Sequence, residues 1–129
     1  MNQRFEIQGR LRSFRNAWQG VLLTLKSQHN AWVHAVVTAG VIVAGLSCAL
    51  SRTEWCLIVL AAAAVWTAEA LNTALEFLAD AVVKEFHPTV GRAKDVAAGG
   101  VLLSALGAVV VGVLVFGPHA FVWVGAMRP

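Results

Sequence analysis

Residues 31–50 form an unbroken run of 20 residues that contains no Asp, Glu, Lys or Arg. About 20 apolar residues in a helix are enough to cross the hydrocarbon core of a bilayer. The whole chain of 129 residues is 58% hydrophobic and 13% charged, whereas a soluble domain carries about 25% charged residues. These features predict an all-α integral membrane protein that forms a single membrane domain over residues 1–129.

Two more transmembrane helices are expected downstream. Residues 55–68 are apolar but too few to span a bilayer, so this helix must continue through Glu69 and covers about residues 55–83. Residues 96–117 predict the third span.

The segments between the spans are polar. Residues 51–54 are expected to form a tight turn, and residues 84–95 a polar loop in which Pro88 acts as a helix breaker. Lys94 and Asp95 are then expected to begin the third helix, where a first-turn acid would complement the helix dipole.

An amphipathic helix is predicted before the first span, over about residues 10–28. Its apolar residues recur at spacings of three and four, the helical period, and basic residues flank this stripe. This pattern is typical of a helix that lies in the membrane interface.

The basic residues predict the orientation of the chain. Eight of the ten fall in the N-terminal segment or in the 84–95 loop: Arg4, Arg10, Arg12, Arg15, Lys26, Lys84, Arg92 and Lys94. By the positive-inside rule both segments are cytoplasmic. Because this charge borders apolar runs, anionic lipid or phosphate is a better partner for it than nucleic acid.

The second span carries an acidic stripe on one face. Glu69, Asn72, Glu76 and Asp80 lie at offsets of 0, 3, 7 and 11 residues, which places them along one side of a helix. One acidic side chain at the centre of a span costs roughly 2.5–3.5 kcal/mol, so the stripe must face protein, water or cations. A structural polar seam between helices is the alternative interpretation.

These residue types suit phosphoryl transfer, which requires positioning, a cation and an acceptor for the hydroxyl proton. Carboxylates are ligands for magnesium, Lys94 suits phosphate oxygens, and the amides at a helix N-terminus also bind phosphate. Glu69 lies deepest in the membrane, where a general base would meet a lipid hydroxyl.

The run E-A-L-N-T-A-L-E-F-L-A-D, followed by G-R-A-K-D-V-A-A-G, resembles the prokaryotic diacylglycerol kinase family, which includes the undecaprenol kinases of Gram-positive bacteria. The resemblance covers roughly residues 10–117. It implies a homotrimer in the bacterial inner (cytoplasmic) membrane, with its active sites at the cytoplasmic surface, shared between neighbouring subunits. It also implies Mg-ATP and a membrane lipid alcohol as reactants.

The resemblance also implies roles for individual residues. Glu69 would be the catalytic base, and Glu76 with Gln28 would hold Mg²⁺. Trp18 and Asn30 would join Glu69 at the lipid substrate. The nucleotide would be bound by Asn72, Glu76, Asp80, Glu85, His87, Lys94 and Asp95.

One position departs from the family pattern. The family usually places a glutamate at the end of the surface helix as a second metal ligand, and this chain has Gln28 there. An amide oxygen ligates magnesium without contributing charge, so weaker metal binding is expected.

The predicted function is therefore a lipid kinase that converts diacylglycerol to phosphatidic acid. Undecaprenol is the alternative acceptor. Two other classes stay open: a small ion- or proton-translocating membrane subunit, since an intramembrane carboxylate stripe suits that role, and a non-enzymatic assembly protein.

Overall fold

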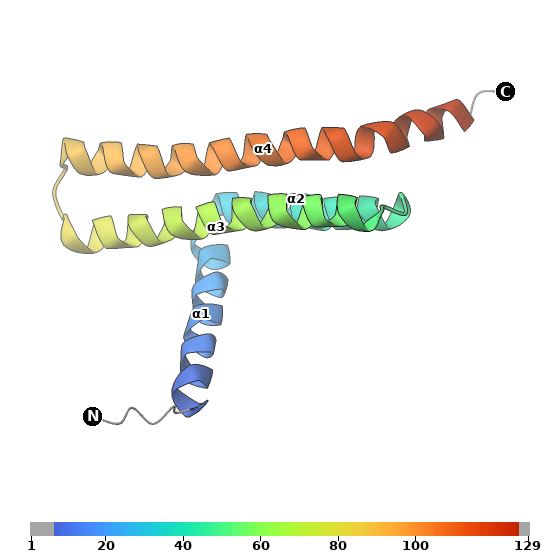
Figure 1. The fold of residues 1–129 in the computed structure, drawn as a ribbon. Coiled ribbons are helices and arrows are strands. Elements are labelled where there is room, and N and C mark those ends of the chain that lie inside the picture. Colours follow the sequence, from blue (N-terminus) through green and yellow to red (C-terminus); the bar gives the residue numbers. More distant parts are fainter. Residues whose placement is uncertain (1–6, 127–129) are drawn as a thin grey trace.

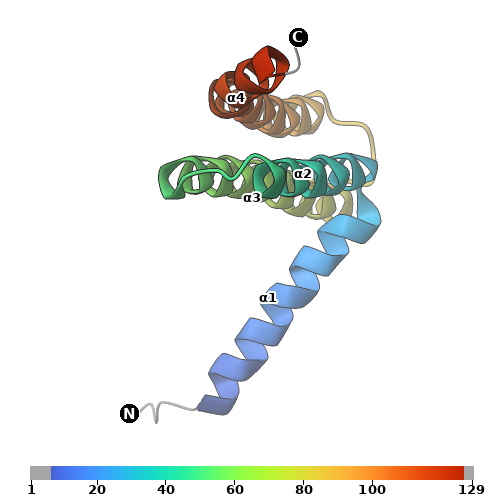
Figure 2. The ribbon, with the colours of Figure 1, turned by 90° about the vertical axis from the view of Figure 1, so that its right-hand side faces the viewer.

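The computed structural model describes residues 7–126, and all of its regular structure in that range is helical. Four helices follow one another along the chain: α1 (Ile7–Ser27), α2 (His29–Ser47), α3 (Arg52–Val82) and α4 (Pro88–Ala126). Helices α2, α3 and α4 run side by side, whereas α1 runs across their direction and projects away from them (Figures 1 and 2).

Helices α2, α3 and α4 are each long and apolar enough to cross a membrane, with mean hydropathies of 1.5, 1.6 and 2.5 over their candidate spans. Large apolar side chains remain exposed along all three of them, for example Val36, Leu46, Leu60, Leu103 and Leu114. Such surfaces need lipid or protein around them. The prediction of a multi-pass membrane protein is confirmed.

The hairpin of α3 and α4 forms the most extensive helix–helix contact. At the end where α3 begins, a small core of Leu50, Ile58 and Val115 is buried between α2, α3 and α4. There Gly45 lets the Trp55 ring approach closely, since a Cβ atom at Gly45 would lie 2.8 Å from Trp55 Cη2.

The beginning of α3 differs from the sequence prediction, because residues 52–54 belong to the helix and not to a turn. The Ser51 hydroxyl accepts the Glu54 N–H at 3.3 Å, and the Glu54 carboxylate accepts the Ser51 N–H at 2.7 Å. This reciprocal capping box satisfies two amides that would otherwise lack partners. The chain therefore turns over residues 48–51.

The beginning of α4 corrects a second expectation. The helix starts at Pro88, so Lys94 and Asp95 lie beyond its first turn, and Asp95 is not a first-turn acid. Proline is favoured at the first position of a helix, where its missing N–H costs nothing. The His87 ring caps this end, since its Nδ1 accepts the Thr89 N–H at 3.3 Å.

Candidate active site

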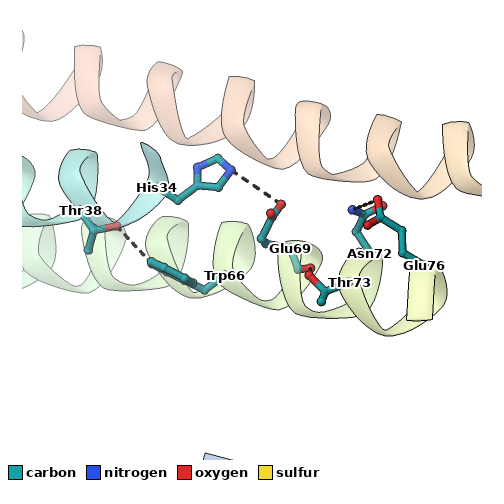
Figure 3. A network of polar contacts seen from close by, with 7 residues as sticks. All are labelled: His34, Thr38, Trp66, Glu69, Asn72, Thr73 and Glu76. Atoms are coloured by element: carbon teal, nitrogen blue, oxygen red, sulfur yellow. Dashed lines mark hydrogen bonds and ion pairs between the residues drawn. The ribbon is translucent and has the colours of Figure 1, made fainter. Parts of the chain in front are cut away.

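The stripe on α3 runs from a buried end to an open end. Glu69 is 1% exposed and Asn72 is 7% exposed, Glu76 is half-buried, and the Asp80 side chain is 68% exposed. The side chains of Glu69, Asn72 and Glu76 point from α3 toward α4 (Figure 3). One face of α3 thus bears a row of polar side chains that begins in an apolar interior and ends in solvent.

Glu69 is the most unusual group of the stripe. Neither of its carboxylate oxygens has a hydrogen-bond partner, and Asn72 Oδ1 is also buried without one. An unpaired buried polar group is costly, so these atoms indicate a place where a ligand or a moving side chain supplies the missing contact. The nearest basic group is His34 on α2, whose Nε2 lies 3.9 Å from Glu69 Oε2.

Glu76 is the point where three segments of the chain meet. Its Oε2 accepts a hydrogen bond from Gln28 Nε2 at 2.5 Å, and its Oε1 accepts one from Asn72 Nδ2 at 3.1 Å. Gln28 is the N-cap residue of α2, with an extended backbone that separates α1 from α2. The structure therefore brings the predicted metal ligands together.

A cleft of about 240 Å³ opens beside Glu69. Asn30, Val33 and His34 of α2 line one side, and Glu69 and Asn72 of α3 lie next to them; the α4 wall consists of Ala98, Val101, Leu102 and Ala105. The cleft is mostly apolar and presents its few polar groups on one side, as ligand sites commonly do.

Asp80 and Lys94 form an ion pair at the open end of the stripe, with Lys94 Nζ 2.5 Å from Asp80 Oδ1. This contact joins the last turns of α3 to the beginning of α4. The Lys94 side chain is 34% exposed, which leaves its charge accessible to an anion from solution.

The remaining predicted residues, apart from Asn30, are not brought into this cleft. Glu85 and Asp95 are exposed near the α3–α4 connection, and the exposed His87 ring serves as the cap of α4. Trp18 is 58% exposed on α1 and is absent from the cleft lining, whereas Asn30 lines it.

The donor set at Gln28 and Glu76 fits magnesium. Within residues 7–126 no group of three or more His, Cys, Asp or Glu side chains is arranged to hold a metal. Magnesium, however, is usually bound by one or two carboxylates, with substrate phosphates and water completing its shell. Glu76 supplies such a carboxylate, and Gln28 would supply an amide oxygen once its amide turns over.

His34 is a residue that the sequence analysis did not single out. It lies in the apolar run 31–50, and an ionisable residue within a span is costly and commonly functional. The sequence shows this ionisable residue within the span, but it does not show which side chains contact His34. The ring stands edge-on to Trp66 with centroids 6.5 Å apart, and Trp66 Nε1 donates to Thr38 Oγ1 at 3.2 Å.

Comparison with known proteins identifies similar chains. Residues 15–116 match the family described as prokaryotic diacylglycerol kinase. An undecaprenol kinase of Bacillus subtilis is 33% identical over 117 residues, which cover 91% of this chain and 95% of that relative. A diacylglycerol kinase of Synechocystis sp. is 40% identical over 101 residues, which cover 78% of this chain but 58% of that relative.

Proposed function

Since this chain belongs to the prokaryotic diacylglycerol kinase family and is an ATP-dependent lipid kinase, we propose that it transfers the γ-phosphate of Mg-ATP to diacylglycerol and forms phosphatidic acid. The observation that carries this proposal is the stripe on α3. It begins at a buried carboxylate that lacks hydrogen-bond donors and ends at an exposed lysine–aspartate pair.

The open end suits the nucleotide. Lys94 is a point charge for phosphate oxygens, and its partner Asp80 keeps it at the α3–α4 junction. Asn72 and Glu76 lie further along the same face. Glu85, His87 and Asp95 would border the nucleotide from the α3–α4 connection and the first turns of α4.

Glu76 and Gln28 would hold Mg²⁺, which neutralises phosphate charge when it is bound. Their side chains already touch across 2.5 Å, so little rearrangement would be needed beyond the turn of the Gln28 amide. Because Gln28 is neutral, this pair carries one negative charge.

Glu69 would act as the general base. A hydroxyl that enters the cleft from the lipid would meet its unpaired oxygens, and proton removal by a well-placed group contributes about 10²–10⁴-fold to a rate. Asn30 lines the same cleft. Trp18, on α1, would contact the lipid at the membrane surface.

Undecaprenol is the second candidate acceptor. The relative named undecaprenol kinase matches this chain over 95% of its own length, which favours that acceptor. The relative named diacylglycerol kinase is the more identical over the matched residues, which favours diacylglycerol. The cleft is lined mostly by small and apolar residues, and these suit either lipid.

The membrane arrangement is also part of the proposal. The amphipathic α1 would lie on the cytoplasmic surface of the bacterial inner membrane, and α2, α3 and α4 would cross it. Both α1 and the α3–α4 connection then lie on the cytoplasmic side. A homotrimer would cover part of the apolar surface that a single chain leaves exposed.

The test is phosphate transfer from labelled Mg-ATP in mixed micelles, with diacylglycerol and undecaprenol offered side by side. Labelling of diacylglycerol that Glu69→Gln abolishes would support the proposal. The matched control is Glu54→Gln, the same chemical change at the other end of α3, where glutamine also supports a capping box. Full activity of the Glu69→Gln variant would refute the role of the base, and labelling of undecaprenol alone would refute the acceptor.

A further inference from the structure

Glu69 lacks the partner that a buried carboxylate requires. Its side chain is 1% exposed, and neither oxygen receives a hydrogen bond. Asn72, one turn along α3, does not fill the gap: its Nδ2 donates to Glu76 and not to Glu69, and its Oδ1 can only accept.

His34 is the group placed to supply the missing partner. Its Nε2 lies 3.9 Å from Glu69 Oε2, which is beyond hydrogen-bond range but requires a shift of only about 1 Å to enter it. Figure 3 shows the imidazole on α2 directed toward the Glu69 carboxylate. Catalytic hydrogen bonds are often long in ligand-free structures and tighten once the substrate binds.

The ring of His34 is held by its neighbours. It stands at 68° to the Trp66 ring, an edge contact of the kind aromatic pairs prefer. Trp66 is in turn fixed by its hydrogen bond to Thr38, which lies one helical turn beyond His34 on α2. Helices α2 and α3 thereby aim the imidazole at Glu69.

No other titratable side chain competes for Glu69 within the cleft lining. The α4 wall consists of apolar residues, and Asn30 and Asn72 are neutral. The next carboxylate on α3, Glu76, is engaged by Gln28 and Asn72. The His34 side chain is 17% exposed, so its ring is not fully enclosed by the helices.

We propose that His34 is the proton partner of Glu69, an inference that rests on the proposed function and extends it. Glu69 takes the proton of the lipid hydroxyl as the lipid oxygen bonds to the γ-phosphorus and ADP departs. The proton then passes from the Glu69 carboxyl to neutral His34 Nε2. The imidazolium and the carboxylate form an ion pair, and His34 later releases the proton to water, which restores the starting state.

This order of proton transfers explains why the Glu69 carboxylate lies in an apolar cleft without hydrogen-bond donors. Before reaction its two oxygens are buried without hydrogen-bond donors, which is a costly state. After reaction it has a cation beside it, so the transfer removes that cost as the phospholipid forms. His34 acts through Glu69 and is therefore a positioning residue.

The test compares His34→Gln with the parent protein in the micelle assay, across pH. Glutamine places an amide nitrogen near the position of Nε2 but accepts no proton. We expect kcat to fall by about 10²-fold, with little change in the KM for ATP. The dependence of kcat/KM on pH should also differ between the two proteins, because only the parent has an ionisable side chain at position 34.

The control is His119→Gln, the same chemical change on α4, where the ring contacts Glu54 at 2.9 Å and lies outside the lining of the cleft. It should keep the parent pH profile. His34→Asn, which also accepts no proton, provides a second variant if His34→Gln does not fold. The inference is overturned if a folded His34 variant keeps the parent kcat and pH profile, or if His119→Gln reproduces the loss. An active Glu69→Gln enzyme would instead overturn the proposed function itself.

Discussion

Replacing Gln28 by glutamate should make the protein depend on magnesium for its stability. In the structure Gln28 Nε2 lies 2.5 Å from Glu76 Oε2 and donates a hydrogen bond to it. Gln28→Glu removes this donor and places a second carboxylate beside the first. The contact that joins α2 to α3 then becomes repulsive in the absence of a cation.

The magnitude follows from the distance and the surroundings. Losing a hydrogen bond to a charged acceptor costs about 1.5–3 kcal/mol. Two carboxylates that relax to about 4 Å apart repel by about 1 kcal/mol in water and by about 4 kcal/mol at an effective dielectric constant of 20. Glu76 is half-buried, so solvent screening reduces the second figure. We expect a metal-free destabilisation of about 2–5 kcal/mol.

Magnesium should reverse this loss, because a divalent cation between the two carboxylates turns repulsion into attraction. The assay is the thermal unfolding midpoint in detergent micelles, first with a chelator and then across a Mg²⁺ titration. The Mg²⁺ concentration for half-maximal stabilisation should fall at least about tenfold, which corresponds to about 1.4 kcal/mol.

The matched control is Gln28→Ala, which loses the hydrogen bond without adding charge. This variant should be destabilised, but its response to Mg²⁺ should not exceed that of the parent. The reasoning is refuted if Gln28→Glu is as stable as the parent in chelator. It is also refuted if Gln28→Glu and the parent are stabilised at the same Mg²⁺ concentration.

Three further predictions test other parts of the molecule. Glu69→Gln should raise the thermal midpoint by an amount equivalent to about 1–3 kcal/mol, because a neutral amide costs less to bury than an unpaired carboxylate; a lowered midpoint in the same scan would contradict this. Gly45→Ala should destabilise the protein by about 1–3 kcal/mol, since the new Cβ atom would lie 2.8 Å from Trp55 Cη2. In parallel unfolding scans the control Gly40→Ala should be neutral or stabilising, because its Cβ atom would meet nothing within 4 Å. Lys94→Met should raise the KM for ATP at least about tenfold, equivalent to about 1.4 kcal/mol. The thermal unfolding midpoint should hardly change, because exposed ion pairs contribute about 0–1 kcal/mol. An unchanged KM in steady-state kinetics would exclude Lys94 from nucleotide binding.

The helical period was sufficient to predict the polar stripe of α3. Glu69, Asn72 and Glu76 share a face because 3.6 residues form each turn, and no tertiary information is needed for that. Their different burial was not readable, because it depends on where α4 lies against α3. The contact of Gln28 with Glu76 joins residues 48 positions apart, and only the resemblance to the family placed them at one site.

The helix boundaries were missed for local reasons that the sequence does contain. Ser51 and Glu54 have the S-x-x-E spacing of a capping box, so residues 52–54 could have been assigned to α3. Pro88 was interpreted as a helix breaker although proline is favoured at the first helical position. This second error displaced the beginning of α4 and put Lys94 and Asp95 in its first turn.

The stripe also separates the two reactants by their solvation. Asp80 lies eleven residues after Glu69, a rise of about 16 Å along the helix, and exposure increases between them. On the proposed function, the nucleotide enters from the wet end, near Lys94, and extends its γ-phosphate toward Glu69, where the lipid hydroxyl arrives from the apolar side. Water is scarce where the base operates, so the lipid oxygen meets little competition as the nucleophile. A kinase built this way disfavours ATP hydrolysis without a closing lid, because the depth of the base excludes the competing nucleophile.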